Sequence, residues 1–186
     1  MSEDPVVAAL RKRMEGSLET LRKEFAGIRT GRASANMLDP VRVDAYGQSL
    51  PMNQVGSVSA PEPRLIVVQV WDKGLVKSVE KAIREANMNL NPQADGSLVR
   101  VPIPDLSEDR RKEMTKITAK YAEQARVAVR NVRREGMDAL KKQEKDGTLS
   151  QDAHKRLDKD VQTLTDAMVK KVDDMLHQKD KEILQV

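Results

Sequence analysis

Arginine gives this sequence its clearest chemical signal. From Arg110 to Arg134 the chain carries nine basic residues and only two acidic ones, Glu113 and Glu123. Four of the basic residues lie close together near the end of this stretch: Arg126, Arg130, Arg133 and Arg134. A guanidinium group is a planar fork of N–H donors that matches phosphate, and a row of forks can follow a nucleic-acid backbone. The pattern favours recognition of RNA helices by shape, because side chains cannot read their deep groove.

These arginines lie in one predicted helix that runs from Ser107 to Asp146. Ser107 is a candidate N-cap, Glu108 and Asp109 place negative charge in the first turn, and Gly147 is a natural stop. Such a helix is about 58 Å long, so we expect it to form part of a helical rod. Residues spaced by three and four define its expected buried stripe: Met114, Ile117, Tyr121, Ala125, Ala128, Val132 and Ala139.

The arginines fall on the face opposite this stripe. With Tyr121 as the centre of the apolar side, Arg126, Arg130, Arg133 and Arg134 lie roughly 120° to 220° around the helix, and Lys112, Lys116 and Lys141 join them. A charge run is more often a solvated surface than a binding site. Here binding is favoured because the charges are mostly arginine, acids are scarce, and the chain from Asp146 onward leans acidic, with nine acids and seven bases. The interpretation requires that the protein's own carboxylates do not engage these guanidinium groups.

Two further helices are predicted. Asp4 can cap a first helix with Pro5 at its first position, and the expected end is Thr30-Gly31, with Gly31 as the C-cap. Ser150 can cap a third helix that runs almost to the C-terminus. None of the three can bury its apolar stripe alone, so residues 1–30 and 106–186 are predicted to form a three-helix bundle. Gly136 is expected to allow close helix packing within it.

Residues 31–105 form a separate predicted module, which makes the fold class α+β. They hold seven of the eight prolines and balance eight basic against eight acidic residues. We expect a hairpin over 41–50, a strand over 64–71, a short helix over 75–86 and a last hairpin around Asp95-Gly96, with Trp71 in the core. Two crossings should connect the module to the bundle as a hinge of limited range, namely Thr30, Gly31 and Arg32 on one side and Pro102, Pro104 and Asp105 on the other.

No catalytic constellation is apparent. The chain has no cysteine, which excludes thiolate metal sites and cysteine nucleophiles and suits a reducing cytosol. His154 and His177 are separated by 23 positions on one predicted helix, about 35 Å, so they cannot share a metal, and we expect both at the surface. No apolar run could span a bilayer. We therefore expect a cytoplasmic monomer that is not an enzyme and uses no cofactor or metal. A coiled-coil adaptor that binds a protein partner is the alternative, and an enzyme acting through the module is a remote third possibility.

Several segments closely resemble the bacterial ribosome recycling factor family. They are Phe25-Ala-Gly-Ile-Arg-Thr-Gly-Arg-Ala-Ser34, Leu90-Asn91-Pro92, Asp109-Arg-Arg-Lys112, Glu123-Gln-Ala-Arg-Val-Ala-Val-Arg-Asn-Val-Arg-Arg134 and Val161-Gln-Thr-Leu-Thr-Asp166. The resemblance covers the whole chain. Asp105 and Ser107 replace the commoner Pro and Thr at the hinge, and Asn87-Met88-Asn89 replaces a commoner Asp-Leu-Gly.

The resemblance implies an L-shaped protein whose bundle binds the large subunit of the post-termination ribosome. Elongation factor G with GTP would then drive the module against the contacts between the subunits, so that the subunits part and mRNA and tRNA are released. Carried onto this sequence, the residues that bind ribosomal RNA should be Arg130 and Arg133 foremost, with Arg126, Arg29, Arg110 and Arg134. Arg110 enters through the resemblance alone, because the angle count places it on the apolar side of its helix.

Overall fold

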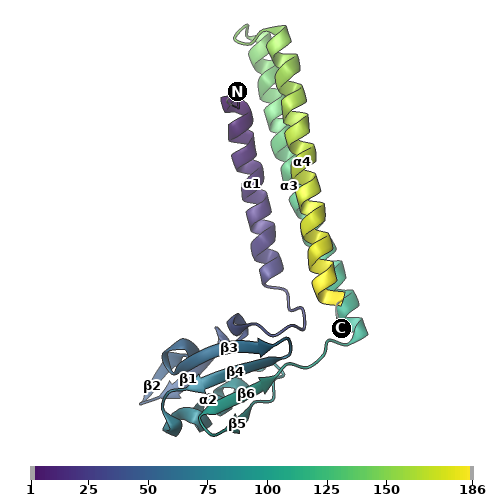
Figure 1. Cartoon of the computed structure of the whole chain (residues 1–186). Helices are drawn as coiled ribbons and strands as arrows, with labels where there is room; N and C mark the ends of the chain where they lie inside the picture. The colour runs from purple at the N-terminus through teal and green to yellow at the C-terminus, as the bar shows by residue number, and fades with distance from the viewer. Residues whose placement is uncertain (1–2, 185–186) are drawn as a thin grey trace. The chain divides into compact units, whose positions relative to one another are not determined.

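The protein is described here from a computed structural model that covers residues 3–184. The chain divides into two compact units (Figure 1). Of the described residues, one unit contains 3–29 and 108–184, and the other contains Thr30–Ser107. The first unit is helical and the second combines strands with a short helix, so the α+β prediction is confirmed. Within residues 3–184, no helix combines the length and apolar character needed to cross a membrane.

Three helices make up the helical unit: α1 (Pro5–Ala26), α3 (Glu108–Lys145) and α4 (Gln151–Leu184). The predicted helix caps at Asp4, Ser150 and Gly147 are present. The Asp4 side chain accepts a hydrogen bond from the Val6 amide, with Pro5 in the first turn, and Ser150 Oγ accepts one from the Ala153 amide at 3.1 Å. Gly147 closes α3 with a φ of 79°. Figure 1 shows α3 and α4 side by side along their length.

The predicted end of α1 is wrong. The helix stops at Ala26, and its C-cap is Gly27 with a right-handed φ of −76°. The Ile28 amide donates to the Phe25 carbonyl at 3.1 Å, a tightened closing turn that satisfies a helix-end carbonyl. Gly31 does adopt a positive φ of 75°, but it does so in the connection beyond the helix. A Cβ at Gly31 would lie 3.2 Å from Leu106 Cγ, so the two connecting segments approach closely at this glycine.

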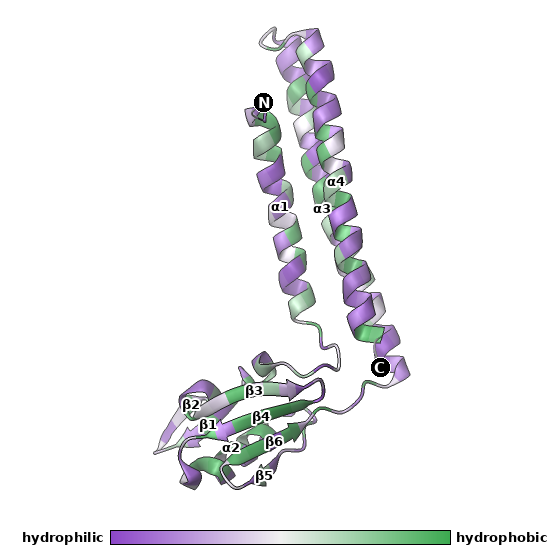
Figure 2. Cartoon of the chain, viewed as in Figure 1, coloured by the Kyte–Doolittle hydropathy of each residue, from purple (hydrophilic) through white to green (hydrophobic). Residues whose placement is uncertain are grey.

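The bundle core is built from one stripe on each helix, and apolar and polar residues alternate along all three in Figure 2. Gly136 is buried in α3, and a Cβ there would lie 2.5 Å from Leu10 Cδ1 of α1. The predicted close packing at Gly136 is therefore confirmed. The buried residues of α4 are Leu157, Val161, Leu164, Thr165, Met168, Val172 and Ile183.

The buried stripe of α3 differs from the predicted one. Ile117 is 43% exposed and Ala139 is also exposed, whereas the buried residues are Thr118, Ala122, Ala125, Val129, Val132, Gly136 and Leu140. This stripe is centred roughly 60° around the helix from Tyr121. The error arose because Ile117 and Tyr121 carry more apolar surface than the small residues that pack against α1 and α4. The rotation brings Arg126 and Arg133 closer to α4 than the sequence predicted.

The second unit contains two sheets and the helix α2 (Val76–Glu85). Strands β1 (Arg42–Ala45) and β2 (Gln48–Pro51) form an antiparallel hairpin. Strands β3 (Gly56–Glu62), β4 (Leu65–Val70), β5 (Gln93–Asp95) and β6 (Leu98–Pro102) form a sheet in the order β3-β4-β6-β5. The sequence missed β3, because its serines and Pro61 indicate a loop and most of the strand is exposed at the sheet edge.

Trp71 was predicted to be buried, and this is wrong. The side chain is 65% exposed. In β4 the buried positions are Ile66, Val68 and Val70, so the two-residue period of a strand places Trp71 on the other side of the chain. The next residue, Asp72, accepts a hydrogen bond from the hydroxyl of Tyr46, whose side chain is 72% exposed.

His154 was predicted at the surface, but its side chain is only 14% exposed. Nδ1 contacts the Glu144 carboxylate, and Nε2 lies 3.2 Å from Asp158 Oδ2. The hydrogen bond to Glu144 raises the pKa of His154 above its ordinary value of 6.5, although partial burial opposes the shift. His154 thus links the end of α3 to the first turns of α4, and the link is strongest when the imidazole is protonated.

This link predicts a pH-dependent stability. Because the folded-state pKa is raised, the stabilisation is fully present below pH 6.5 and is lost as the pH rises through the folded-state pKa. The melting temperature of the wild type should therefore exceed that of His154→Gln most clearly in acid, and the difference should shrink as the pH rises. The exposed His177 provides a control in His177→Gln. A difference that is constant from pH 5 to pH 9 would contradict the link.

Candidate nucleic-acid interface

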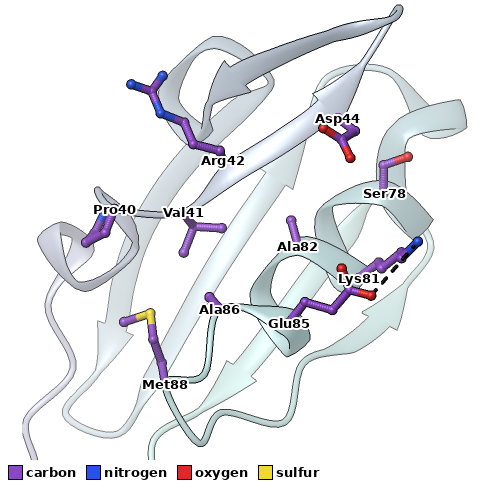
Figure 3. A pocket seen from close by; sticks show the side chains of 10 residues that line it. All are labelled: Pro40, Val41, Arg42, Asp44, Ser78, Lys81, Ala82, Glu85, Ala86 and Met88. Atoms are coloured by element: carbon purple, nitrogen blue, oxygen red, sulfur yellow. Dashed lines mark ion pairs between the residues drawn. The ribbon is translucent and has the colours of Figure 1, made fainter.

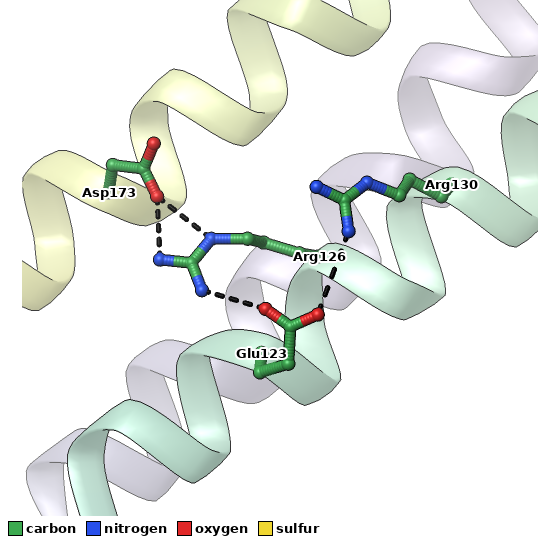
Figure 4. A network of polar contacts seen from close by, with 4 residues as sticks. All are labelled: Glu123, Arg126, Arg130 and Asp173. Atoms are coloured by element: carbon green, nitrogen blue, oxygen red, sulfur yellow. Dashed lines mark hydrogen bonds and ion pairs between the residues drawn. The ribbon is translucent and has the colours of Figure 1, made fainter.

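Arg126 lies in a network that ties α3 to α4 (Figure 4). Its Nε lies 2.8 Å from Asp173 Oδ1 of α4, and its Nη1 lies 3.0 Å from Glu123 Oε2, one turn earlier in α3. The side chain is only 19% exposed. Burial lowers its pKa, but the hydrogen bonds to Asp173 and Glu123 outweigh this and raise the pKa above the ordinary value. Arg126 is thus permanently charged and is held by two carboxylates of its own protein.

Arg130 is held more loosely. Its Nη1 lies 3.6 Å from Glu123 Oε1, beyond normal hydrogen-bond length, and its side chain is 53% exposed. Exposed pairs of this kind contribute little free energy, so an incoming phosphate could displace Glu123 at small cost. Figure 4 shows Glu123 between the Arg126 and Arg130 side chains, with Asp173 on the far side of Arg126.

Arg133 has a neutral partner. Its Nε donates to Gln162 Oε1 of α4 at 2.7 Å, and Gln162 Nε2 donates to Asp166 Oδ1 at 2.9 Å. An amide carries no charge, so the positive charge of Arg133 is not neutralised by this contact, while Nε is fixed and the terminal nitrogens are left for a ligand. Arg134, the next residue, is exposed, and no ion pair or hydrogen bond of its side chain occurs within residues 3–184.

A shallow groove joins these residues to α4. It has a volume of about 390 Å³ and is lined by Arg130, Arg133, Gln162, Thr165, Asp166, Val169, Lys170 and Asp173. The sequence pattern indicates the α3 side of this groove but not the α4 side. Gln162 and Lys170 are polar residues on an ordinary amphipathic helix, and only the packing of α4 against α3 gives them a place at the site.

Four of the nine cations from Arg110 to Arg134 form an ion pair with a carboxylate of the described residues. Arg126 and Arg130 share Glu123, Arg110 Nη1 lies 3.0 Å from Glu113 Oε2, and Lys112 pairs with Glu108 at 2.9 Å. Arg110 was expected on the apolar side, yet its side chain is 65% exposed, as the rotation of the buried stripe requires. Arg29 is exposed in the segment that follows α1. The protein's own carboxylates leave the guanidinium group of Arg133 free, because its partner is the Gln162 amide. They do not leave Arg126 free, and Arg130 Nη1 also lies 3.6 Å from Glu123.

The predicted hinge residues occupy three kinds of position. Thr30, Gly31 and Arg32 lie beyond α1, and the next residue, Ala33, donates from its amide to the Pro63 carbonyl at 2.6 Å. Pro102 is the last residue of β6 and pairs with Leu65, so it belongs to the sheet rather than to a connection. Pro104 follows the sheet, and the Asp105 carboxylate forms an ion pair with Arg64.

Across residues 3–184, no group of three or more histidine, aspartate or glutamate side chains is gathered so that it could hold a metal ion. The α3–α4 groove presents the positive groups of Arg130, Arg133 and Lys170 beside the carboxylates of Asp166 and Asp173.

Comparison with known proteins places these features in one family. The family model described as "Ribosome recycling factor" matches residues 21–184. The ribosome-recycling factor of Rhodospirillum centenum is 63% identical over 98% of this chain and 99% of its own length, and that of Maricaulis maris is 56% identical over the full length of both.

The chain is also similar to solved structures of ribosome recycling factors. The solution structure of a ribosome recycling factor is 39% identical, covers 100% of both chains and has a TM-score of 0.70. A second structure presents models for the T. thermophilus ribosome recycling factor and the E. coli elongation factor G bound to the E. coli post-termination complex. Its matching chain is 43% identical, with 97% of each chain covered and a TM-score of 0.60. By sequence along nearly its whole length, this chain belongs to the ribosome recycling factor family.

Proposed function

We propose that this protein binds the post-termination ribosome and, with elongation factor G and GTP, separates it into subunits, so that mRNA and tRNA are released. It is a non-enzymatic translation factor, and it acts in the cytoplasm as a monomer. The names of its relatives support this role, and the partners are supported by the solved structure in which a family member accompanies elongation factor G on the post-termination complex.

The ribosome-binding surface in this proposal is the exposed side of α3 around Arg130, Arg133 and Arg134, on ribosomal RNA of the large subunit. The observation that carries the assignment is the neutral partner of Arg133, because Gln162 orients the guanidinium group without neutralising it. The nearby Arg130 is half exposed, and Arg134 is exposed. Together they present a row of planar guanidinium groups that can bind phosphate.

Arg126 takes a different part. Two carboxylates hold it, so it positions Glu123 and thereby Arg130, and it contributes less direct contact with RNA. Arg29 and Arg110, both exposed in the helical unit, add further contacts with phosphate in this proposal.

The second unit supplies the moving part. The two units have separate cores, since every residue of one core cluster lies in the helical unit and every residue of the other lies between Leu38 and Ile103. Two connecting segments serve as the hinge. One contains Thr30, Gly31 and Arg32. The other contains Pro104 and Asp105 and begins after Pro102, which is paired within the sheet. Force from the GTPase would then turn the second unit against the contacts between subunits.

One experiment tests the proposal directly. Ribosomes stalled after termination are incubated with this protein, elongation factor G and GTP, and free subunits are scored by sedimentation. Free subunits should appear only when both factors and GTP are present. Intact ribosomes in the complete mixture, with the protein bound, would contradict the proposed function.

Binding to ribosomal RNA predicts a strong dependence on salt. Each phosphate neutralised by an arginine releases counterions, so the logarithm of affinity should fall linearly with the logarithm of salt concentration, by about 0.7 to 0.9 for each contact. Five contacts, from Arg29, Arg110, Arg130, Arg133 and Arg134, would give a slope of about −3.5 to −4.5. Affinity for purified large subunits is measured from 50 to 300 mM salt. An adaptor that docks on a protein through apolar contacts would give a nearly flat line.

A further inference from the structure

The hairpin of the second unit leaves one strand edge open. Strand β1 pairs only with β2, and the register joins Arg42 to Pro51, Val43 to Leu50, Asp44 to Ser49 and Ala45 to Gln48. An edge strand presents a row of N–H and C=O groups that can pair with another extended chain. The structural question is which groups of β1 point to the open side.

The turn between β1 and β2 determines which main-chain groups of β1 point away from β2. Tyr46 and Gly47 have positive φ angles of 52° and 74°, as in the two-residue turn of type I′. In such a hairpin the flanking residues, Ala45 and Gln48, exchange hydrogen bonds, and the pattern then alternates along the strands. Val43 therefore also faces β2, and the main-chain groups of Arg42 and Asp44 point away from it. Pro51 fits this pattern, because it has no N–H to offer Arg42.

No other element uses these groups within residues 3–184. The main-chain hydrogen bonds outside helices and sheets include one from the Val41 amide to the Leu38 carbonyl at 3.0 Å, and none of them involves Arg42 or Asp44. The side chains of both residues are exposed, and neither makes an ion pair with a described residue. At Arg42 and Asp44, the main-chain N–H and C=O groups and the charged side chains are therefore available to a ligand.

A groove lies along this edge, between β1 and α2 (Figure 3). Its volume is about 480 Å³, within the range that holds small ligands. Its floor is apolar and is formed by Val41 of the chain before β1 with Ala82, Ala86 and Met88 from α2 and the segment after it. On the α2 side, Lys81 and Glu85 pair with each other at 3.9 Å, so the unmatched charges of the groove are those of Arg42 and Asp44.

We propose that this groove binds an extended segment of a partner protein, which joins β1 as an added strand. The segment carries one acidic and one basic residue two positions apart, opposite Arg42 and Asp44, with a small apolar residue between them. Residues two apart on a strand share a face, so the charged pair lies beside Arg42 and Asp44 while the residue between them points to Ala82 and Ala86. This is recognition by strand addition, in which the main chain gives affinity and alternate side chains give selectivity.

Synthetic peptides test the proposal on the full-length protein. Three capped heptapeptides differ only in their charges: Thr-Val-Glu-Ala-Lys-Val-Thr, Thr-Val-Glu-Ala-Glu-Val-Thr and Thr-Val-Lys-Ala-Lys-Val-Thr. Amide resonances are followed by NMR during titration, together with hydrogen exchange. The first peptide should bind about fivefold more tightly than the others, since each of them places one like charge against the edge. The amides of Arg42 and Asp44 should become protected, which contact through side chains alone would not cause.

Two variants should change the preference in opposite directions. Asp44→Arg makes the edge cationic and should bind the peptide with two glutamates best, whereas Arg42→Asp should bind the peptide with two lysines best. Both positions are exposed, so folding is not at risk. Ser57→Arg, at an exposed position on β3 of the other sheet, adds the same charge away from the groove and should keep the wild-type order.

Three results would overturn the proposal: no protection at Arg42 and Asp44, the same ranking of peptides in all variants, or dimerisation of the protein that both variants abolish. The last result would assign the edge to a second copy of this chain. None of these outcomes depends on ribosome binding, so the groove and the proposed function stand or fall separately.

Discussion

Arg130→Glu combined with Arg133→Glu is expected to lower the affinity for post-termination ribosomes by about 100-fold or more at moderate salt. Hydrogen bonds to charged groups contribute about 1.5 to 3 kcal/mol each, so the loss of two corresponds to this factor. The added carboxylates would also face phosphate and the protein's own Asp166, which hydrogen-bonds Gln162 in the same groove. Free subunits should fall in parallel, because the protein can no longer dock.

The measurement is an equilibrium binding curve with purified ribosomes, accompanied by circular dichroism to show that helicity is unchanged. Arg156→Glu combined with Lys171→Glu provides a matched control: it reverses two exposed charges on α4, about 120° and 180° around that helix from Gln162. The control should bind within about threefold of wild type, because exposed charges outside the contact act only through a screened field. Normal binding by the double variant in α3 would remove α3 as the ribosome-binding surface.

The fold was largely predictable because its elements are long and regular. Asp4, Pro5, Ser150 and Gly147 mark helix ends by local chemistry, and the structure places each in the predicted role. The failures come from weaker local signals. The end of α1 was placed at Gly31 because a glycine there could close a helix, but Gly27 comes first and ends it with a right-handed φ. Strand β3 has too few apolar residues to stand out from a loop.

The candidate site was only half predictable. The arginines of α3 are evident in the sequence, but the partners that distinguish them come from α4, 47 positions from Arg126 and 29 positions from Arg133. The register between two helices follows from packing, and the small residues of the true α3 stripe give a weak signal. The rotation of that stripe by roughly 60° decides that Arg126 meets the carboxylate of Asp173 and Arg133 meets the amide of Gln162.

Replacing residues 31–105 by a flexible Gly/Ser linker of about ten residues is expected to separate binding from splitting. The helical unit should keep its fold, because its core cluster contains no residue of the second unit. A linker of this length adds only a modest closure entropy. The proposed phosphate contacts all lie in the helical unit, and residues 31–105 carry eight basic and eight acidic residues. Affinity for the ribosome should therefore stay within about threefold, since balanced charge adds little long-range attraction.

Subunit separation should instead be lost almost completely, with free subunits near the level seen without the protein. A control carries the same linker inserted after Gly96, in an exposed turn where a Cβ would meet no atom within 4 Å, and it should split ribosomes normally. If the helical unit alone still separated subunits with elongation factor G and GTP, the second unit would not be the lever. If it kept its helicity and failed to bind, the affinity would come from the second unit. Only tight binding without splitting supports a division of labour in which α3 anchors the protein and the second unit moves.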